Sequence, residues 1–158
     1  MKKNLTEIVF ILDKSGSMGG LEQDTIGGFN SLIEKQKKEQ GEAVISTVLF
    51  DHQREVLHDR VCLNRIKPMT EEEYYVRGNT ALLDAVGFAV NHIIKVRRHT
   101  KKEFQPEKTM FIIMTDGHEN ASVHFTYEQI REIIHRQKNQ YDWQFLFIGA
   151  NMDAIGEA

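Results

Sequence analysis

The feature that most constrains the fold is a run of five apolar residues that ends in an acidic, hydroxyl-rich turn. Residues 8–12 read Ile-Val-Phe-Ile-Leu. A strand that is apolar on both faces is typical of a parallel sheet covered by helices on both sides, so we predict a buried strand over residues 7–13. Asp13, Ser15 and Ser17 follow this run, so one carboxylate and two hydroxyls lie on a turn at the end of a strand.

The rest of the chain alternates between the periods of strands and helices. Apolar residues at helical spacing predict helices over residues 21–40 and 80–98, and Thr126 with Gln129 forms a capping box that begins another helix. Strands are predicted over residues 43–50, 54–61, 109–116 and 142–150, with a hairpin between the first two of these. Residues 54–61 alternate polar and apolar, as a half-exposed antiparallel edge strand does. The pattern predicts an α/β fold with a doubly wound, mostly parallel sheet and one antiparallel edge strand.

Composition excludes several classes of protein. Its 158 residues suffice for one domain, and a net charge of -3 argues against a general nucleic-acid binder. The single cysteine, Cys62, excludes an intramolecular disulfide and suits a reducing compartment. No apolar run is long enough for a signal sequence or a membrane span. We therefore expect a soluble, cytoplasmic protein without a nucleic-acid or membrane partner.

Two further loops carry oxygen-bearing side chains. Thr80 follows Gly78-Asn79 at the start of the 80–98 helix, and Asp116 ends the 109–116 strand. In doubly wound sheets, ligands bind beyond the carboxyl ends of the strands, where the strand order reverses. If the strands that end in Asp13 and Asp116 are neighbours at that reversal, their carboxylates face one crevice.

These loops define a predicted metal site, whose ligands are Asp13, Ser15, Ser17, Thr80 and Asp116. All five donors are oxygens, which favours Mg²⁺ or Mn²⁺, with Ca²⁺ also possible, over zinc or copper. Only two of the ligands carry charge, so the ion would attract another anionic oxygen from outside. The ligand set therefore predicts a metal that grips an acidic group of a partner.

A plainer interpretation is that Asp and Ser at strand ends cap the helices that follow them. The agreement of Thr80 and Asp116 with the predicted crevice favours the metal. Tyr74, Tyr75 and Arg77, near the end of a long polar link over residues 62–79, fit two interpretations. In the first, they form a recognition rim, since Tyr and Arg are favoured at interaction hot spots. In the second, they pack the link against the body of the domain.

Enzymatic interpretations have less support. The hydrolase elbow Gly-x-Ser-x-Gly and the phosphate-binding Gly-x-x-x-x-Gly-Lys-Ser/Thr are both absent. His118 and Glu119 lie close to Asp116 and form a candidate acid/base pair, although loop residues of this kind are more often solvated. The prediction is a binding module without enzymatic activity, and the alternative is a metal-dependent hydrolase or phosphatase that uses the same ion.

The ligand pattern resembles the metal ion-dependent adhesion site of the von Willebrand factor type A (vWA) domain, also called the integrin I-like domain. That site has the pattern Asp-x-Ser-x-Ser, then a Thr, then an Asp on a later strand. It corresponds here to residues 13–17, Thr80 within Gly-Asn-Thr-Ala-Leu, and Asp116 within Thr-Asp-Gly. The sequences around Thr80 and Asp116 are most similar to those of bacterial intracellular members of the family.

The resemblance implies a metal-dependent protein-binding module whose partner presents an exposed Asp or Glu. It implies that Ser15, Ser17 and Thr80 bind the ion directly, and that the two aspartates often act through water. The family usually has a further strand and a closing helix, whereas eight residues follow Ala150 here. The expectation is one vWA-like domain over residues 1–158, short at its C-terminus.

Overall fold

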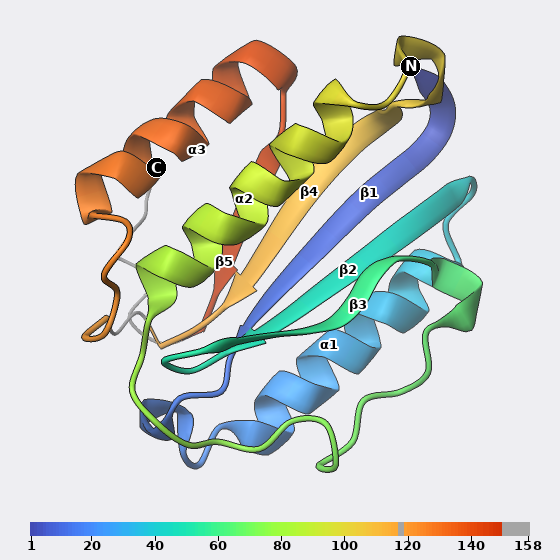
Figure 1. Cartoon of the computed structure of the whole chain (residues 1–158). Helices are drawn as coiled ribbons and strands as arrows, with labels where there is room; N and C mark the ends of the chain where they lie inside the picture. The colour runs from blue at the N-terminus through green and yellow to red at the C-terminus, as the bar shows by residue number, and fades with distance from the viewer. Residues whose placement is uncertain (117–118, 150–158) are drawn as a thin grey trace.

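A computed structural model describes residues 1–116 and 119–149, which form one five-stranded sheet with helices on both faces. The elements are β1 (Lys2–Asp13), α1 (Glu22–Lys37), β2 (Glu42–Phe50), β3 (Arg54–Cys62), α2 (Leu82–Arg98), β4 (Pro106–Met114), α3 (Tyr127–Tyr141) and β5 (Gln144–Ile148). The strand order is β3-β2-β1-β4-β5, and only β3 is antiparallel to its neighbour (Figure 1). The predicted architecture is therefore confirmed.

The central strand β1 is buried on both faces because two helical layers cover it. Ile8, Phe10 and Leu12 pack with α1, whereas Val9 and Ile11 point to the opposite face and pack with α2 and α3. Figure 1 shows α2 and α3 side by side on one face of the sheet and α1 on the other. This arrangement explains the unbroken apolar run, since every side chain of the strand meets a helix. Within the described part of the chain, no helix has both the length and the apolarity to cross a membrane.

The strand order reverses at β1, and this reversal places the candidate site. The chain first builds β2 and β3 on one side of β1, then crosses through α2 to build β4 and β5 on the other side. Leu12 pairs in parallel register with Leu49 of β2 and with Met114 of β4. The loops that follow β1 and β4 and the turn before α2 therefore gather at one end of the sheet (Figure 1).

Several element boundaries differ from the prediction. The helix α2 begins at Leu82, so Thr80 lies in a turn that precedes the helix. The strand β5 begins at Gln144 because Asp142 adopts a left-handed conformation, with φ of 57°, at the C-terminal cap of α3. The predicted end of this strand at Ala150 lies outside the described residues. The capping box of Thr126 and Gln129 is confirmed.

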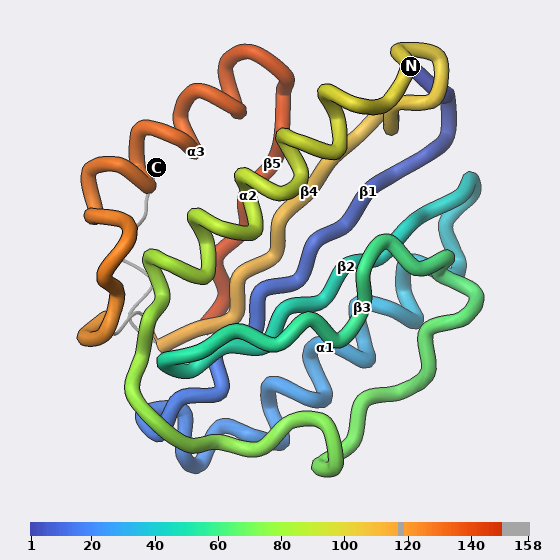
Figure 2. The backbone as a smooth tube through the Cα atoms, viewed as in Figure 1, coloured from blue at the N-terminus to red at the C-terminus, as the bar shows by residue number. Residues whose placement is uncertain are grey.

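The link over residues 62–79 is more than a polar connection. Ile66, Met69 and Tyr74 are buried in the same apolar cluster as the inner face of α1, so the link forms a cover over that side of the sheet. Figure 2 follows its path from the end of β3 to the start of α2, past the loop that leaves β1. The link thus brings the Thr80 turn to the carboxyl end of β1.

Candidate metal centre

The turn after β1 gathers one carboxylate and two hydroxyls. Asp13 and Ser15 have no exposed surface, whereas Ser17 is exposed. The Oδ1 atom of Asp13 accepts hydrogen bonds from the backbone N–H of Ser15 at 2.9 Å and from its Oγ at 2.6 Å. The Oγ atoms of Ser15 and Ser17 lie 2.9 Å apart. Of the two hydroxyl-bearing residues of this turn, Ser15 is therefore buried and Ser17 is at the surface.

The end of β4 meets this turn directly. The Oγ1 of Thr115 donates to Oδ2 of Asp13 at 2.8 Å, as expected of neighbouring strands at the reversal. Burial raises the pKa of Asp13, and the nearby negative charge of Asp116 raises it further, although the hydrogen bonds from Ser15 and Thr115 oppose the shift. A buried carboxylate such as that of Asp13 is costly to ionise unless a positive charge lies close to it.

The turn that carries Thr80 is tied to the Asp13 turn through the backbone. The N–H of Gly16 donates to the carbonyl of Gly78 at 3.0 Å, and the N–H of Arg77 donates to the carbonyl of Lys14 at 2.8 Å. Gly78 has a φ of +76°, and a Cβ there would lie 2.6 Å from Nδ1 of His52. Only glycine permits this close approach, so Gly78 fixes the path of the chain into Thr80.

All five predicted ligand residues therefore lie on loops that meet at the carboxyl ends of β1 and β4. Thr80 and Asp116 are also almost completely buried, and their loops and the Asp13 turn share the hydrogen bonds described above. Within residues 1–116 and 119–149, no three His, Cys, Asp or Glu side chains group as a metal site, so the predicted set depends on hydroxyl ligands. The chemistry of the set, two carboxylates and three hydroxyls, fits a hard divalent cation of the Mg²⁺ type.

One buried carboxylate at this end of the sheet was missed by the sequence analysis. Asp51, directly after β2, has an almost fully buried side chain. It accepts hydrogen bonds from the N–H of Gln53 at 2.7 Å and from Nε of Arg77 at 3.2 Å, and its carbonyl accepts from Ala81 at 2.8 Å. Asp51 thus anchors the Thr80 turn from the side of β2. Its position at the end of a strand, like that of Asp13, was the available signal.

The aromatic residues of the link divide between the two interpretations left open above. Tyr74 is buried, and its hydroxyl donates to the backbone carbonyl of Asp13, so it packs the link against the domain. Burial raises the pKa of Tyr74, which keeps the phenol a neutral donor. Tyr75 and Arg77 are exposed beside the Asp13 turn, and Nζ of Lys14 lies 5.1 Å from the centre of the Tyr75 ring. These exposed side chains are available as a rim.

Of the candidate acid/base pair, the structure describes Glu119, whose carboxylate is occupied by backbone donors. Glu119 is half-buried, and its carboxylate accepts hydrogen bonds from the N–H groups of Leu83, Ala121 and Ser122. The expectation of a solvated loop side chain is therefore wrong for Glu119, because the start of α2 supplies donors to it. His118 lies outside the described residues.

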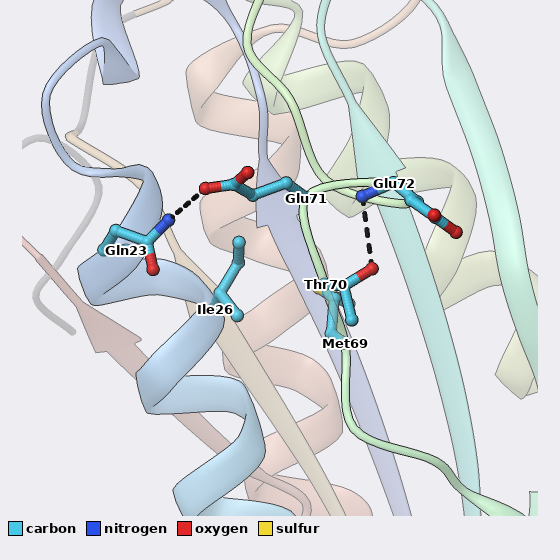
Figure 3. Close-up of a pocket in the computed structure, with 6 residues that line it drawn as sticks. All are labelled: Gln23, Ile26, Met69, Thr70, Glu71 and Glu72. Carbon is cyan, nitrogen blue, oxygen red and sulfur yellow. Dashed lines mark hydrogen bonds between the residues drawn. The ribbon is translucent and has the colours of Figure 1, made fainter.

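A separate pocket of about 470 Å³ lies between α1 and the link (Figure 3). It is lined by Gln23, Ile26, Met69, Thr70, Glu71 and Glu72. The Nε2 of Gln23 donates to Oε1 of Glu71 at 2.6 Å, and the N–H of Glu72 donates to the hydroxyl of Thr70 (Figure 3). None of the predicted metal ligands lines this pocket, so it is distinct from the predicted metal site.

Comparison with known proteins identifies the fold. The sequence matches no protein-family profile and no curated protein. The structure of manganese-loaded TRAP from Plasmodium vivax aligns over 98% of this chain, with a TM-score of 0.65 and 18% sequence identity. BatB from Bacteroides thetaiotaomicron aligns over 91% of the chain, with a TM-score of 0.52 and 18% identity. The chain has a vWA-type fold.

The vWA likeness extends to proteins of varied origin. Proximal thread matrix protein 1 from the mussel byssus aligns over 96% of the chain, with a TM-score of 0.63 and 14% identity. The aligned region covers 62% of the TRAP chain, 66% of the BatB chain and 38% of the mussel chain, so the present chain corresponds to one part of longer proteins. At these identities the likeness shows the fold alone.

Proposed function

We propose that this chain is a metal-dependent protein-binding module. In this proposal one Mg²⁺ or Mn²⁺ ion binds at the carboxyl ends of β1 and β4, and an Asp or Glu side chain of a partner protein completes its coordination. The observation that carries the proposal is the pairing of β1 with β4 at the strand reversal, which brings Thr115 to Asp13 at 2.8 Å and the charge of Asp116 close to both. The Mn²⁺ named for the TRAP structure is consistent with an ion of this class.

The balance of charge supports an acidic partner. Asp13 and Asp116 together at most neutralise a divalent ion, and the remaining proposed ligands, Ser15, Ser17 and Thr80, are neutral. A carboxylate from a partner would therefore be favoured over water at an open coordination position. Ser17 is the exposed member of the set, which supports an ion whose open side would face the surface. The exposed side chains of Tyr75 and Arg77 would then contribute selectivity.

The test is capture of a partner from the source cell with and without chelator. Binding should be lost in EDTA, restored by Mg²⁺ or Mn²⁺, and abolished when the acidic residue of the partner is changed to its amide. Ser17→Ala should weaken capture without unfolding the domain, whereas Ser31→Ala, at an exposed position of α1, should leave it unchanged. Capture that survives EDTA and Ser17→Ala would show that the partner uses another face.

A metal-dependent hydrolase or phosphatase is the second candidate, and no contact among residues 1–116 and 119–149 favours it. The carboxylate of Glu119 is engaged by backbone donors of the α2 start, so it is poorly placed as a general base. We therefore propose that the chain has no hydrolytic turnover of its own. A screen of phosphate esters, acyl esters and nucleotides with Mg²⁺ and Mn²⁺ decides this. Activity that survives repurification and disappears in Asp116→Asn would support the hydrolase instead.

A further inference from the structure

The helix α2 begins without a cap of its own. Its N-cap residue is Ala81, which has no side chain able to accept a hydrogen bond, although the first backbone N–H groups of any helix need partners. Here the partners come from a loop that follows β4. The N–H of Leu83 donates to Oε1 of Glu119 at 2.9 Å, and the N–H of Asp84 donates to Oγ of Ser122 at 2.9 Å. The start of α2 is thus capped from a distant part of the chain.

The same loop is held in shape by two carboxylates. Glu119 accepts from the N–H groups of Ala121 at 3.0 Å and Ser122 at 2.7 Å. Asp84, which is buried in the first turn of α2, accepts from the N–H groups of residues 123–125 at 2.9, 3.0 and 2.9 Å. We call residues 119–125 together with Asp84 the α2 clip. Because each carboxylate satisfies several backbone donors at once, the clip has one well-defined conformation.

Thr80 is the residue that the clip holds most directly. The N–H of Thr80 donates to Oδ1 of Asn120 at 2.9 Å. The carbonyl of Thr80 accepts from the N–H groups of Asn120 at 2.9 Å and Ala121 at 3.0 Å. Both backbone polar groups of Thr80 are therefore engaged by the clip. On the other side of the turn, Gly78 is bonded to Gly16 of the Asp13 turn.

We infer that Glu119 and Asn120 are positioning residues for the metal site, because they fix the backbone of Thr80 and so aim its hydroxyl at the ion. The inference rests on the proposed function. Glu119 lies three residues after Asp116, so the clip also joins the loops of two proposed ligands. A hydroxyl held in place before the ion arrives loses less entropy on binding, and residues that orient ligands commonly affect metal affinity strongly.

A purely structural clip makes a different prediction. If Glu119 only stabilises the fold, its removal lowers the unfolding temperature but leaves the dissociation constant for Mn²⁺ unchanged in the folded protein. If it acts through Thr80, the affinity falls, and the effect disappears once the Thr80 hydroxyl has been removed. A double-mutant cycle separates these cases.

The experiment measures Mn²⁺ binding by calorimetric titration of the full chain, below the unfolding temperature of every variant. The variants are Glu119→Gln, Asn120→Ala, Thr80→Ala and the two combinations with Thr80→Ala. Glu128→Gln, at an exposed position in the first turn of α3, is the control for loss of one carboxylate charge. Asn120 is exposed, so its substitution tests the same contact to Thr80 in a variant that folds readily if Glu119→Gln does not.

We expect the dissociation constant to rise about 10-fold or more in Glu119→Gln and Asn120→Ala, as is common for residues that orient metal ligands. The control should be unchanged, and neither substitution should weaken binding further in the Thr80→Ala background. Unchanged affinity in both single variants, or an equal loss with and without the Thr80 hydroxyl, would overturn the inference.

Hydrogen exchange of the metal-free proteins distinguishes a failure of this inference from a failure of the proposed function. We expect the amides of Thr80 and residues 120–125 to exchange faster in Glu119→Gln than in Glu128→Gln. If the wild-type chain binds no Mn²⁺, the proposed function fails, whatever the exchange shows. If it binds Mn²⁺ but these amides exchange equally in both variants, Glu119 does not hold the turn, and the positioning role fails alone.

Discussion

Replacing Asp13 with Asn should make the metal-free domain more stable and remove its response to metal. The Asp13 carboxyl has no exposed surface, and burial, together with the charge of Asp116, raises its pKa. An acid whose pKa is higher in the folded than in the unfolded chain stabilises the fold least when it is ionised. The metal-free wild type should therefore lose stability as the pH rises above about 3.9, the ordinary pKa of Asp, and through the higher folded value.

The structure indicates that Asn fits this position. Its Oδ1 retains the hydrogen bonds from the N–H and Oγ of Ser15, at 2.9 and 2.6 Å. The hydroxyl of Thr115, which donates to Oδ2 in the wild type, is able to accept from the new amide instead. Each unit by which the folded pKa of Asp13 exceeds its unfolded value costs the ionised wild type about 1.4 kcal/mol, and the variant is free of that cost.

Metal should reverse this ranking. An ion present at 100 times its dissociation constant stabilises the folded wild type by about 2.7 kcal/mol. For a chain of this size that corresponds to a rise in unfolding temperature of roughly 5–11 °C. The variant, without the anionic ligand, should gain little.

Thermal unfolding at pH 7, in EDTA and in excess Mn²⁺, measures both effects. Asp59→Asn, an exposed aspartate on β3, is the control and should respond to Mn²⁺ as the wild type does. The reasoning fails if Asp13→Asn is less stable than the wild type in EDTA, or if Mn²⁺ raises the unfolding temperatures of both proteins equally.

Three other predictions follow from the fold. Burial lowers the pKa of His58, so the folded protein should lose stability as the pH falls below about 6.5. Urea unfolding at pH 7 and pH 5 should show that His58→Gln loses less stability between these pH values than the wild type does. A Cβ on Gly87 would lie 2.5 Å from the Phe125 ring, so chemical denaturation should show that Gly87→Ala destabilises the domain by about 1–3 kcal/mol. At Gly27 no atom lies within 4 Å of the added Cβ, so Gly27→Ala should stabilise the domain by up to about 1 kcal/mol in the same assay. Amides of residues 145–148 in β5, which pairs with β4 alone among the described strands, should exchange faster than those of residues 9–12 in β1, and equal protection in a proven monomer would contradict this.

The fold was predictable because its signals are local. The apolar run of residues 8–12 indicates a strand that is covered on both faces, and the mixed pattern of residues 54–61 indicates a partly exposed strand at the edge of the sheet. The capping box of Thr126 and Gln129 depends on atoms three residues apart, and it was found for the same reason. Element ends were less accurate, since the left-handed conformation of Asp142 has no strong sequence signature.

The support around the candidate site was not predictable, because it consists of contacts between distant residues. The acceptor role of Asp84 depends on the N–H groups of residues 123–125, and that of Glu119 depends on Leu83. Periodicity reports which side chains are covered, whereas it carries no information about which loop supplies a donor.

The measurement that tests the central claim most directly is calorimetric titration of chelator-treated protein with Mn²⁺ and Mg²⁺. The account predicts saturable binding of one ion per chain. It also predicts strong weakening in Asp116→Asn and Ser17→Ala and no change in Ser31→Ala. Absence of saturable binding, or equal affinity in the wild type and Asp116→Asn, would contradict it.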